Sequence, residues 1–249
     1  MVGATFVAFQ ADLRFIGAML YKTKGIAISY IRFRETSIIA KIYTESFGIQ
    51  SYIVNSVRSS KARGNKIALF QPLTLLDMVV YHKDKQASVH RISEMKCLVP
   101  FHSIPFEIAK SSIGLFLTEI LGKTLKEEEQ NEPLFDFLYQ SILHLDNMEE
   151  GFENFHIQFM IYYASYLGFG IESMRELELE LKQHHYPYLA NRAQEDVVNM
   201  ILQQIGYEKI PLDRIGRSSL LEKLIYFYKI HIEGIGELKS LDVLREVLR

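Results

Sequence analysis

Short runs of β-branched and aromatic residues, separated by turn-forming residues, fill positions 20–99 of the chain. Turn chemistry lies between the runs, as in Ser-Phe-Gly at 46–48 and the Ser-, Gly- and Asn-containing stretch 59–65. Short strands at this spacing are typical of a small antiparallel barrel or sandwich. Polar and apolar positions alternate imperfectly, so the pattern does not predict a register. The five runs cover 25–31, 37–43, 50–54, 73–81 and 87–98.

After Pro100 the apolar positions recur at helical spacing. Pro133 is suited to the first turn of a helix, and an aromatic stripe at 152–166 ends at Gly168. Ser173 and Glu176 have the spacing of a capping box, and Ser240 is a candidate N-cap. The pattern therefore predicts an all-α module that follows the β-module in the chain. Its remaining candidate helices cover 106–120, 197–205, 220–232 and 241–248.

Composition excludes several classes of protein. The chain has 249 residues, 48% of them hydrophobic and 12% aromatic, which is enough to build a buried core. It contains no run of 18 apolar residues, and Asp12 and Arg14 interrupt an N-terminal stretch that makes a poor signal peptide. The single cysteine, Cys97, excludes an intramolecular disulfide and a cysteine-based zinc site. We expect a soluble cytoplasmic protein that is not attached to a membrane.

A net charge of −2 conceals two oppositely charged halves. Residues 19–100 carry thirteen Lys and Arg against five Asp and Glu, whereas residues 101–249 carry fourteen against twenty-four. A basic module next to an acidic one indicates that the first faces a polyanion.

The basic residues concentrate in one predicted loop, 58–66, which carries Arg58, Lys61, Arg63 and Lys66 and no acid. Mobile cations interleaved with Ser, Gly and Asn are suited to phosphate oxygens. Further cations and the aromatic residues Tyr30, Phe33, Tyr43 and Tyr52 lie on the neighbouring strands, so bases could stack beside a cationic groove. The alternative is that the loop is only a solvated surface and the aromatic residues belong to the core.

Catalysis finds no support in the sequence. The eight histidines lack metal-ligand spacing, and the adjacent His184 and His185 have no nearby cysteine or aspartate. No nucleophile elbow, phosphate-binding loop or dinucleotide fingerprint is present. We therefore expect a non-enzymatic protein without a cofactor or a metal site.

Several segments resemble the RecO family of bacterial DNA repair proteins. The resemblance runs from about residue 19 to the end of the chain, and its N-terminal part is the more specific. Family members usually begin near Met19, so residues 1–18 are either a misassigned start or a short extension, and no function is inferred from them. The segments are KTKGI at 22–26, ETSII at 35–39, YTESFGIQSYIV at 43–54, the basic loop 58–66, YLGFG at 166–170 and LKSLDVL at 238–244.

The resemblance implies an OB-fold DNA-binding domain at 19–100 and a helical domain at 101–249. It also implies a recombination mediator that binds single- and double-stranded DNA and anneals complementary strands. Such a protein works with RecR and single-stranded DNA-binding protein to load recombinase at gaps, at the nucleoid. Carried over by position, the expected DNA contacts are Lys22, Lys24, Arg32, Arg34, Arg58, Lys61, Arg63 and Lys66.

The chain departs from the family pattern at one point. Many members hold zinc with four cysteines after the glycine motif, but residues 171–200 contain no cysteine. A second class of function stays open, in which the chain is a protein-interaction scaffold and its barrel is only structural. A hydrolase or nuclease is disfavoured because no ligand or nucleophile constellation is visible.

Overall fold

A computed structural model describes residues 19–55, 57, 66–82, 89–187, 192–204 and 206–249. The chain divides into two compact units. The first contains the residues up to Val99 together with Glu127–Asn131, and the second contains Pro100–Lys126 and Glu132–Arg249. The short segment Glu127–Asn131 thus returns from the helical part of the sequence to the β-unit.

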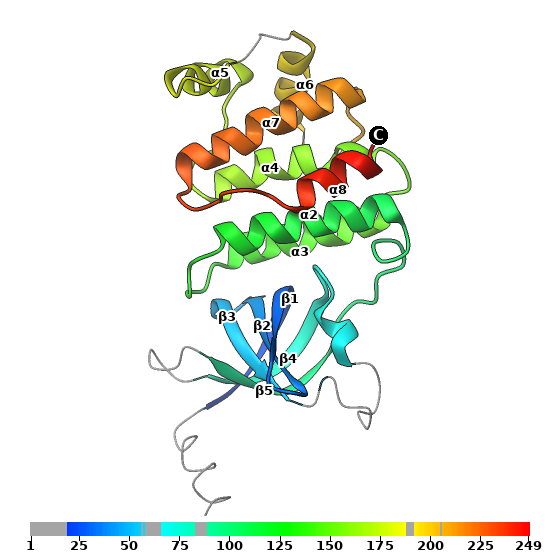
Figure 1. Ribbon diagram of the computed structural model, residues 1–249, viewed down its shortest axis with the longest axis vertical. Coiled ribbons are helices and arrows are strands. Elements are labelled where there is room, and N and C mark those ends of the chain that lie inside the picture. The colour runs from blue at the N-terminus through cyan, green and yellow to red at the C-terminus, as the bar shows by residue number, and fades with distance from the viewer. Residues whose placement is uncertain (1–18, 56, 58–65, 83–88, 188–191, 205) are drawn as a thin grey trace, which may run out of the picture. The chain divides into compact units, whose positions relative to one another are not determined.

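The β-unit is a five-stranded barrel within the described residues (Figure 1). Its strands follow the order β1-β2-β3-β5-β4, and every neighbouring pair is antiparallel except β3 and β5. That parallel pairing is short, with Tyr52 opposite His90 and Ile53 opposite Arg91. The predicted fold class, a small antiparallel β-domain followed by a helical domain, is confirmed. The strands are β1 (Met19–Phe33), β2 (Ser37–Thr44), β3 (Gly48–Val54), β4 (Leu75–His82) and β5 (His90–Cys97), and the short 3-10 helix η2 (Lys66–Phe70) precedes β4.

Strand β1 pairs with two neighbours and changes face along its length. Its first half pairs with β4 and its second half with β2, and a bulge shifts the β2 register between Ala27 and Ser29. Before the bulge, Ala27 lies opposite the core residue Ile42; after it, Tyr30 lies opposite the core residue Ala40. Paired residues on neighbouring strands project to the same face. After the bulge the even-numbered residues of β1 therefore project to the core side, whereas before it the odd-numbered residues do, because one extra residue breaks the two-residue alternation.

Apolar residues fill the interior of the barrel, because the two-residue alternation along each strand brings them to the inward face. Ile38, Ala40 and Ile42 of β2 are completely buried, and Met78 and Val80 of β4 join them. Burial of each Ile, Met or Val side chain in this set contributes about 1.5–3 kcal/mol. This core positions the strand ends that carry the basic side chains.

Seven α-helices make up the described part of the second unit. Part of the aromatic stripe predicted at 152–166 is buried on α4, namely Phe155 and Phe159, whereas Tyr162 is half-buried and Tyr166 is exposed. Phe152 lies before α4, in the 3-10 helix η3 (Phe152–Asn154). The helices are α2 (Ile108–Thr124), α3 (Glu132–Asn147), α4 (Phe155–Tyr166), α5 (Met174–Gln183), α6 (Arg192–Gln203), α7 (Arg214–His231) and α8 (Ser240–Val247).

Two of the predicted helix ends have the expected chemistry. The Ser173 hydroxyl oxygen accepts a hydrogen bond from the Glu176 backbone N–H at the start of α5. At the end of α4, Gly168 has a φ of 87°, and Phe169 donates its N–H to the carbonyl of Ala164. This left-handed turn satisfies the last carbonyls of the helix and favours glycine.

The prediction that Ser240 caps α8 is wrong. Lys239 occupies the cap position and its side chain forms no capping bond, while the Ser240 hydroxyl donates to a carboxylate on α2 instead. That carboxylate, Glu119, also accepts the backbone N–H groups of Lys239 and Ser240 at 3.0 and 2.8 Å. A distant acid therefore replaces the local cap, which no sequence-local signal could reveal.

A buried carboxylate ties the start of the helical unit to α3. Asp146 accepts the backbone N–H groups of His102, Ser103 and Ile104 at 3.0, 2.9 and 2.9 Å. Burial by itself raises the pKa of the Asp146 carboxyl, but these N–H donors outweigh it and hold the pKa below its usual range.

Replacing Asp146 with Asn removes a charge-assisted acceptor and leaves N–H donors badly matched. We expect a loss of about 2–3 kcal/mol of unfolding free energy at pH 7. The folded-state pKa is depressed, so the stabilisation is present above the unfolded pKa of about 3.9 and is lost as pH falls through the folded pKa. Urea unfolding of the unmodified chain and of the Asp146→Asn variant at pH 7 and at pH 3 measures the loss of unfolding free energy at each pH.

The matched control is Asp136→Asn, an exposed position on the same helix. It should change stability little at either pH. An Asp146→Asn deficit that persists unchanged into acid would contradict the carboxylate explanation.

Gly48 supports a second stability prediction. It begins β3 with a φ of 61°, and a Cβ built there would lie 2.3 Å from the carbonyl oxygen of Glu127. Gly48→Ala should therefore cost the unfavourable φ and a backbone clash, together about 3 kcal/mol or more. Gly168→Ala is the control, because its φ is also positive but nothing lies within 4 Å of the added Cβ, so about 1 kcal/mol is expected. Equal losses in urea unfolding would contradict the close approach of Glu127–Asn131 to β3.

Candidate nucleic-acid interface

Five of the eight cations predicted to contact DNA lie in the described part of the chain. Lys22, Lys24 and Arg32 lie on β1, Arg34 follows this strand, and Lys66 begins η2. Arg58, Lys61 and Arg63 lie outside the described residues. All five described cations are exposed.

Lys22 and Lys24 lie on the outer face of β1, among carboxylates. The Lys24 ammonium donates to Glu45 at 2.8 Å, and the Lys22 ammonium lies 3.9 Å from Asp77. Asp77 is also 3.3 Å from the Lys96 ammonium. Each lysine therefore has an acidic neighbour, which reduces the attraction that this face can exert on an anion.

Arg32 and Arg34 belong to a different surface. The bulge in β1 places Arg32 opposite Ile38, on the core side of the sheet, but it remains exposed because it lies close to the end of the strand. Arg34 adopts a positive φ of 54° in the turn to β2, and its guanidinium carbon lies 5.2 Å from the Phe33 ring centre. The structure thus separates Arg32 and Arg34 from Lys22 and Lys24.

A groove of about 280 Å³ lies at the end of β3, between residues of β3, η2 and β5. Ser37, which pairs with Phe33 beside the turn between β1 and β2, donates its hydroxyl to the Asn55 side chain at 3.1 Å, and Asn55 lines the groove. Lys66 and Arg91 line it as well, together with Leu69 and Met95 among other side chains. Two cations therefore share a partly apolar groove at the end of β3, and the hydrogen bond between Ser37 and Asn55 links this end of β3 to the turn that carries Arg34.

Sequence reasoning missed Arg91 as a candidate. It lines the groove because β5 pairs in parallel with β3, a contact between strands far apart in sequence. The only available signal was a basic residue within a predicted strand. In contrast, the sequence predicts a role for Lys66 because this residue closes the basic loop.

Only part of the predicted aromatic surface can stack with bases. Tyr43 and Tyr52 are buried, and burial raises the pKa of the Tyr43 hydroxyl to about 12. Tyr30 is 41% exposed, with its ring edge-on to Phe70 at 6.5 Å, and Phe33 is half-buried. Tyr30 and Phe33 are thus accessible, whereas Tyr43 and Tyr52 serve the interior.

The described residues contain no group of three or more His, Cys, Asp or Glu side chains that could hold a metal ion. None of the helices in this part of the chain combines the length and hydropathy needed to cross a membrane.

Comparisons with known proteins cover both units. The family description "Recombination protein O N terminal" matches residues 19–101, and "Recombination protein O C terminal" matches residues 105–242. A protein of Flavobacterium psychrophilum named DNA repair protein RecO is 37% identical over 238 residues, which covers 92% of this chain and 99% of that protein. A protein of Bacteroides fragilis with the same name is 35% identical over 246 residues, with the same coverage. The chain therefore belongs to the RecO family of DNA repair and recombination proteins.

Proposed function

We propose that this chain is a non-catalytic recombination mediator whose barrel binds the phosphate backbone of single- and double-stranded DNA. The observation that carries the proposal is that Lys66 and Arg91 line one groove at the end of β3, while the exposed Arg32 and Arg34 lie at the end of β1 and in its turn to β2, the strand that pairs with β3. Cations that neutralise phosphates release counterions, which favours binding without reference to sequence. Arg58, Lys61 and Arg63 complete the proposed contact set, because they follow Val57 and precede Lys66 in the chain.

Annealing follows from the same chemistry. Two complementary strands repel each other through their phosphates, and a basic surface that holds both strands lowers that repulsion. A base stacked on Tyr30 would leave its hydrogen-bonding edge available for pairing. The chain would act on strands coated by single-stranded DNA-binding protein and, with RecR, load recombinase at gaps.

The acidic second unit would serve protein partners in this proposal. Its excess of carboxylates opposes close approach to DNA, while its helices offer surfaces to other proteins. RecR and single-stranded DNA-binding protein are the proposed partners. A mediator of this kind would work in the cytoplasm at the nucleoid.

The alternative is a scaffold with a structural barrel. It is favoured by the ion pairs of Lys22 and Lys24, because these lysines have partners without any nucleic acid. If all barrel cations were of this kind, DNA affinity would be incidental. The two proposals differ in what the cations around the groove do.

Changing Arg32, Arg34, Lys66 and Arg91 together to Glu separates the two proposals. We expect at least about tenfold weaker binding of a fluorescent single strand and slower annealing, because attraction to phosphate becomes repulsion. Annealing is measured on bare strands and on strands coated with single-stranded DNA-binding protein. The second substrate tests partner recognition together with DNA engagement.

The matched control changes four exposed cations of the helical unit, Arg175, Lys182, Arg192 and Lys229, to Glu. It alters the net charge equally and should leave affinity nearly unchanged. If both variants lost DNA affinity equally, the loss would result from the change in net charge and not from the barrel cations. If neither variant lost affinity, the scaffold proposal would be favoured.

Salt dependence provides an independent test. If about four to six phosphates of a single strand are neutralised, log affinity should fall with log salt at a slope of about −3 to −4. The four-residue barrel variant should lower the steepness by up to about 3, at about 0.7 for each lost contact. A flat titration of the unmodified chain would be incompatible with the proposed interface.

A further inference from the structure

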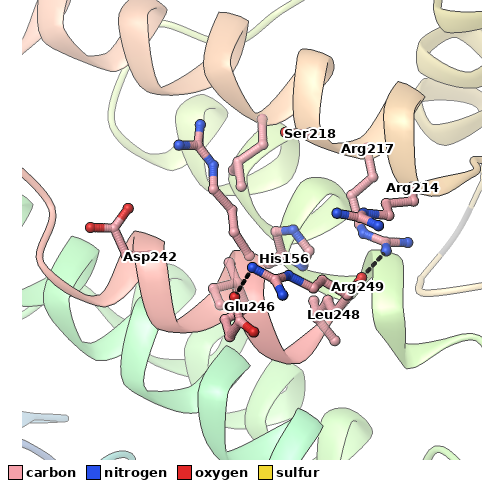
Figure 2. A pocket seen from close by; sticks show the side chains of 11 residues that line it. His156, Arg214, Arg217, Ser218, Asp242, Glu246, Leu248 and Arg249 are labelled. Carbon is pink, nitrogen blue, oxygen red and sulfur yellow. Dashed lines mark hydrogen bonds and ion pairs between the residues drawn. The ribbon is translucent and has the colours of Figure 1, made fainter.

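A pocket lined by arginines lies in the helical unit and shares no residue with the candidate nucleic-acid interface. Residues of α4 and α7, and of α8 and the chain after it, line a half-open pocket of about 350 Å³ (Figure 2). Four arginines line it: Arg214 and Arg217 from α7, and Arg245 and Arg249 from α8 and the residues after it. Asp242 and Glu246 are the acidic residues of the lining. The lining is therefore net positive, although the sequence around it is net acidic.

The α8 arginines differ from the α7 arginines in their neighbours. Arg245 donates to Glu222 at 2.6 Å, and Arg249 pairs with Glu246. On α7, Arg214 is exposed and forms no hydrogen bond or ion pair with the residues that the structure describes. Arg214 therefore keeps its full donor set for a ligand.

Arg217 is held in place by neutral groups rather than by an acid. Its guanidinium donates to the side-chain oxygen of Asn154 at 3.2 Å and to the carbonyl of Leu248 at 2.5 Å. Burial, followed by the nearby charge of Arg214, lowers the pKa of Arg217 against the opposing influence of Glu153 and Asp213. Two cations thus lie three residues apart in the first turns of α7, where the helix dipole also disfavours positive charge. An anion between them would relieve both effects.

The side chain of His156 adds a buried polar group to the same pocket. It is 1% exposed, and its Nδ1 has no hydrogen-bond partner among the described residues. Figure 2 places the His156 imidazole among Arg217, Leu248 and Arg249. Burial, assisted by the charge of Arg217, lowers the pKa of His156 to about 3, so the ring is neutral at pH 7. A neutral imidazole carries one N–H that can donate to an anion.

We propose that this pocket binds an oxyanion of the phosphate class, held by Arg214 and Arg217 beside His156, with Arg249 adding positive charge from the same lining. Planar guanidinium groups match the oxygen spacing of phosphate and bind it with paired hydrogen bonds. A compact anion can lie on the arginine side of the pocket alone. An acidic peptide fits less well, because its further carboxylates would meet Asp242 and Glu246 on the same lining.

The experiment titrates the full chain with inorganic phosphate by calorimetry, with chloride adjusted to hold ionic strength constant. We expect saturable binding and a rise in Tm with phosphate concentration. The double variant R214Q/R249Q should bind phosphate at least about tenfold more weakly. Its unliganded Tm reports whether it folds, which is expected because both side chains are largely exposed.

The control variant R175Q/K182Q removes the same charge from exposed positions on α5 and should bind phosphate like the unmodified chain. A second readout follows the His156 imidazole by NMR, and its pKa should rise when phosphate is bound. Absence of saturable binding would overturn the proposal, as would equal weakening in both variants.

Further measurements identify the source of the phosphate and test whether the barrel cations, instead of the pocket, bind it. Competition by a 5′-phosphorylated oligonucleotide, but not by its 5′-hydroxyl form, would assign the site to a strand end. Binding of inorganic phosphate without such competition would assign it to a free anion. If the barrel variant in Arg32, Arg34, Lys66 and Arg91 loses phosphate binding while R214Q/R249Q keeps it, the pocket proposal fails and the DNA proposal stands. Displacement by an acidic peptide but not by either phosphate ligand would also overturn it.

Discussion

The bulge in β1 is the constraint on which the β-unit depends. This strand pairs with β4 along its first half and with β2 along its second half. It therefore joins the two ends of the strand order, and the five-stranded sheet closes into a barrel. One extra residue near Ile28 bends the strand and reverses the faces to which its side chains project. The core stays continuous, but the cations of one strand are divided between two surfaces.

That division gives the two groups of cations different electrostatic environments. Lys22 and Lys24 face Asp77 and Glu45, so part of their charge is compensated within the barrel. Arg32 and Arg34 lie at the end of β1 and in the turn to β2, and no ion pair compensates them within the described residues, while Lys66 and Arg91 line a groove at the end of β3. The net charge of residues 19–100 does not show this distinction, because it counts the cations without showing which of them have acidic partners.

The helical unit is held together by polar groups as well as by its aromatic core. Asp146 binds the chain at 102–104, and Glu119 binds the start of α8. Lys110 is buried among Ser103, the carbonyl of Asp146 and that of Met148. Buried polar groups are costly unless they are fully bonded, so these contacts specify one arrangement of the helices. The arginine pocket differs, because cations accumulate there with fewer acidic partners.

The sequence by itself determined the change from strands to helices near residue 100, the aromatic face of α4 and the ends of α4 and α5. Each of these follows from residues within a few positions of one another, through side-chain periodicity or a local hydrogen bond. Tertiary structure alone decided the bulge, the capping of α8 by Glu119, the place of Arg91 and the meeting of Arg214, Arg217 and Arg249. These features depend on groups brought together from distant positions, and a linear pattern carries no record of which segments become neighbours.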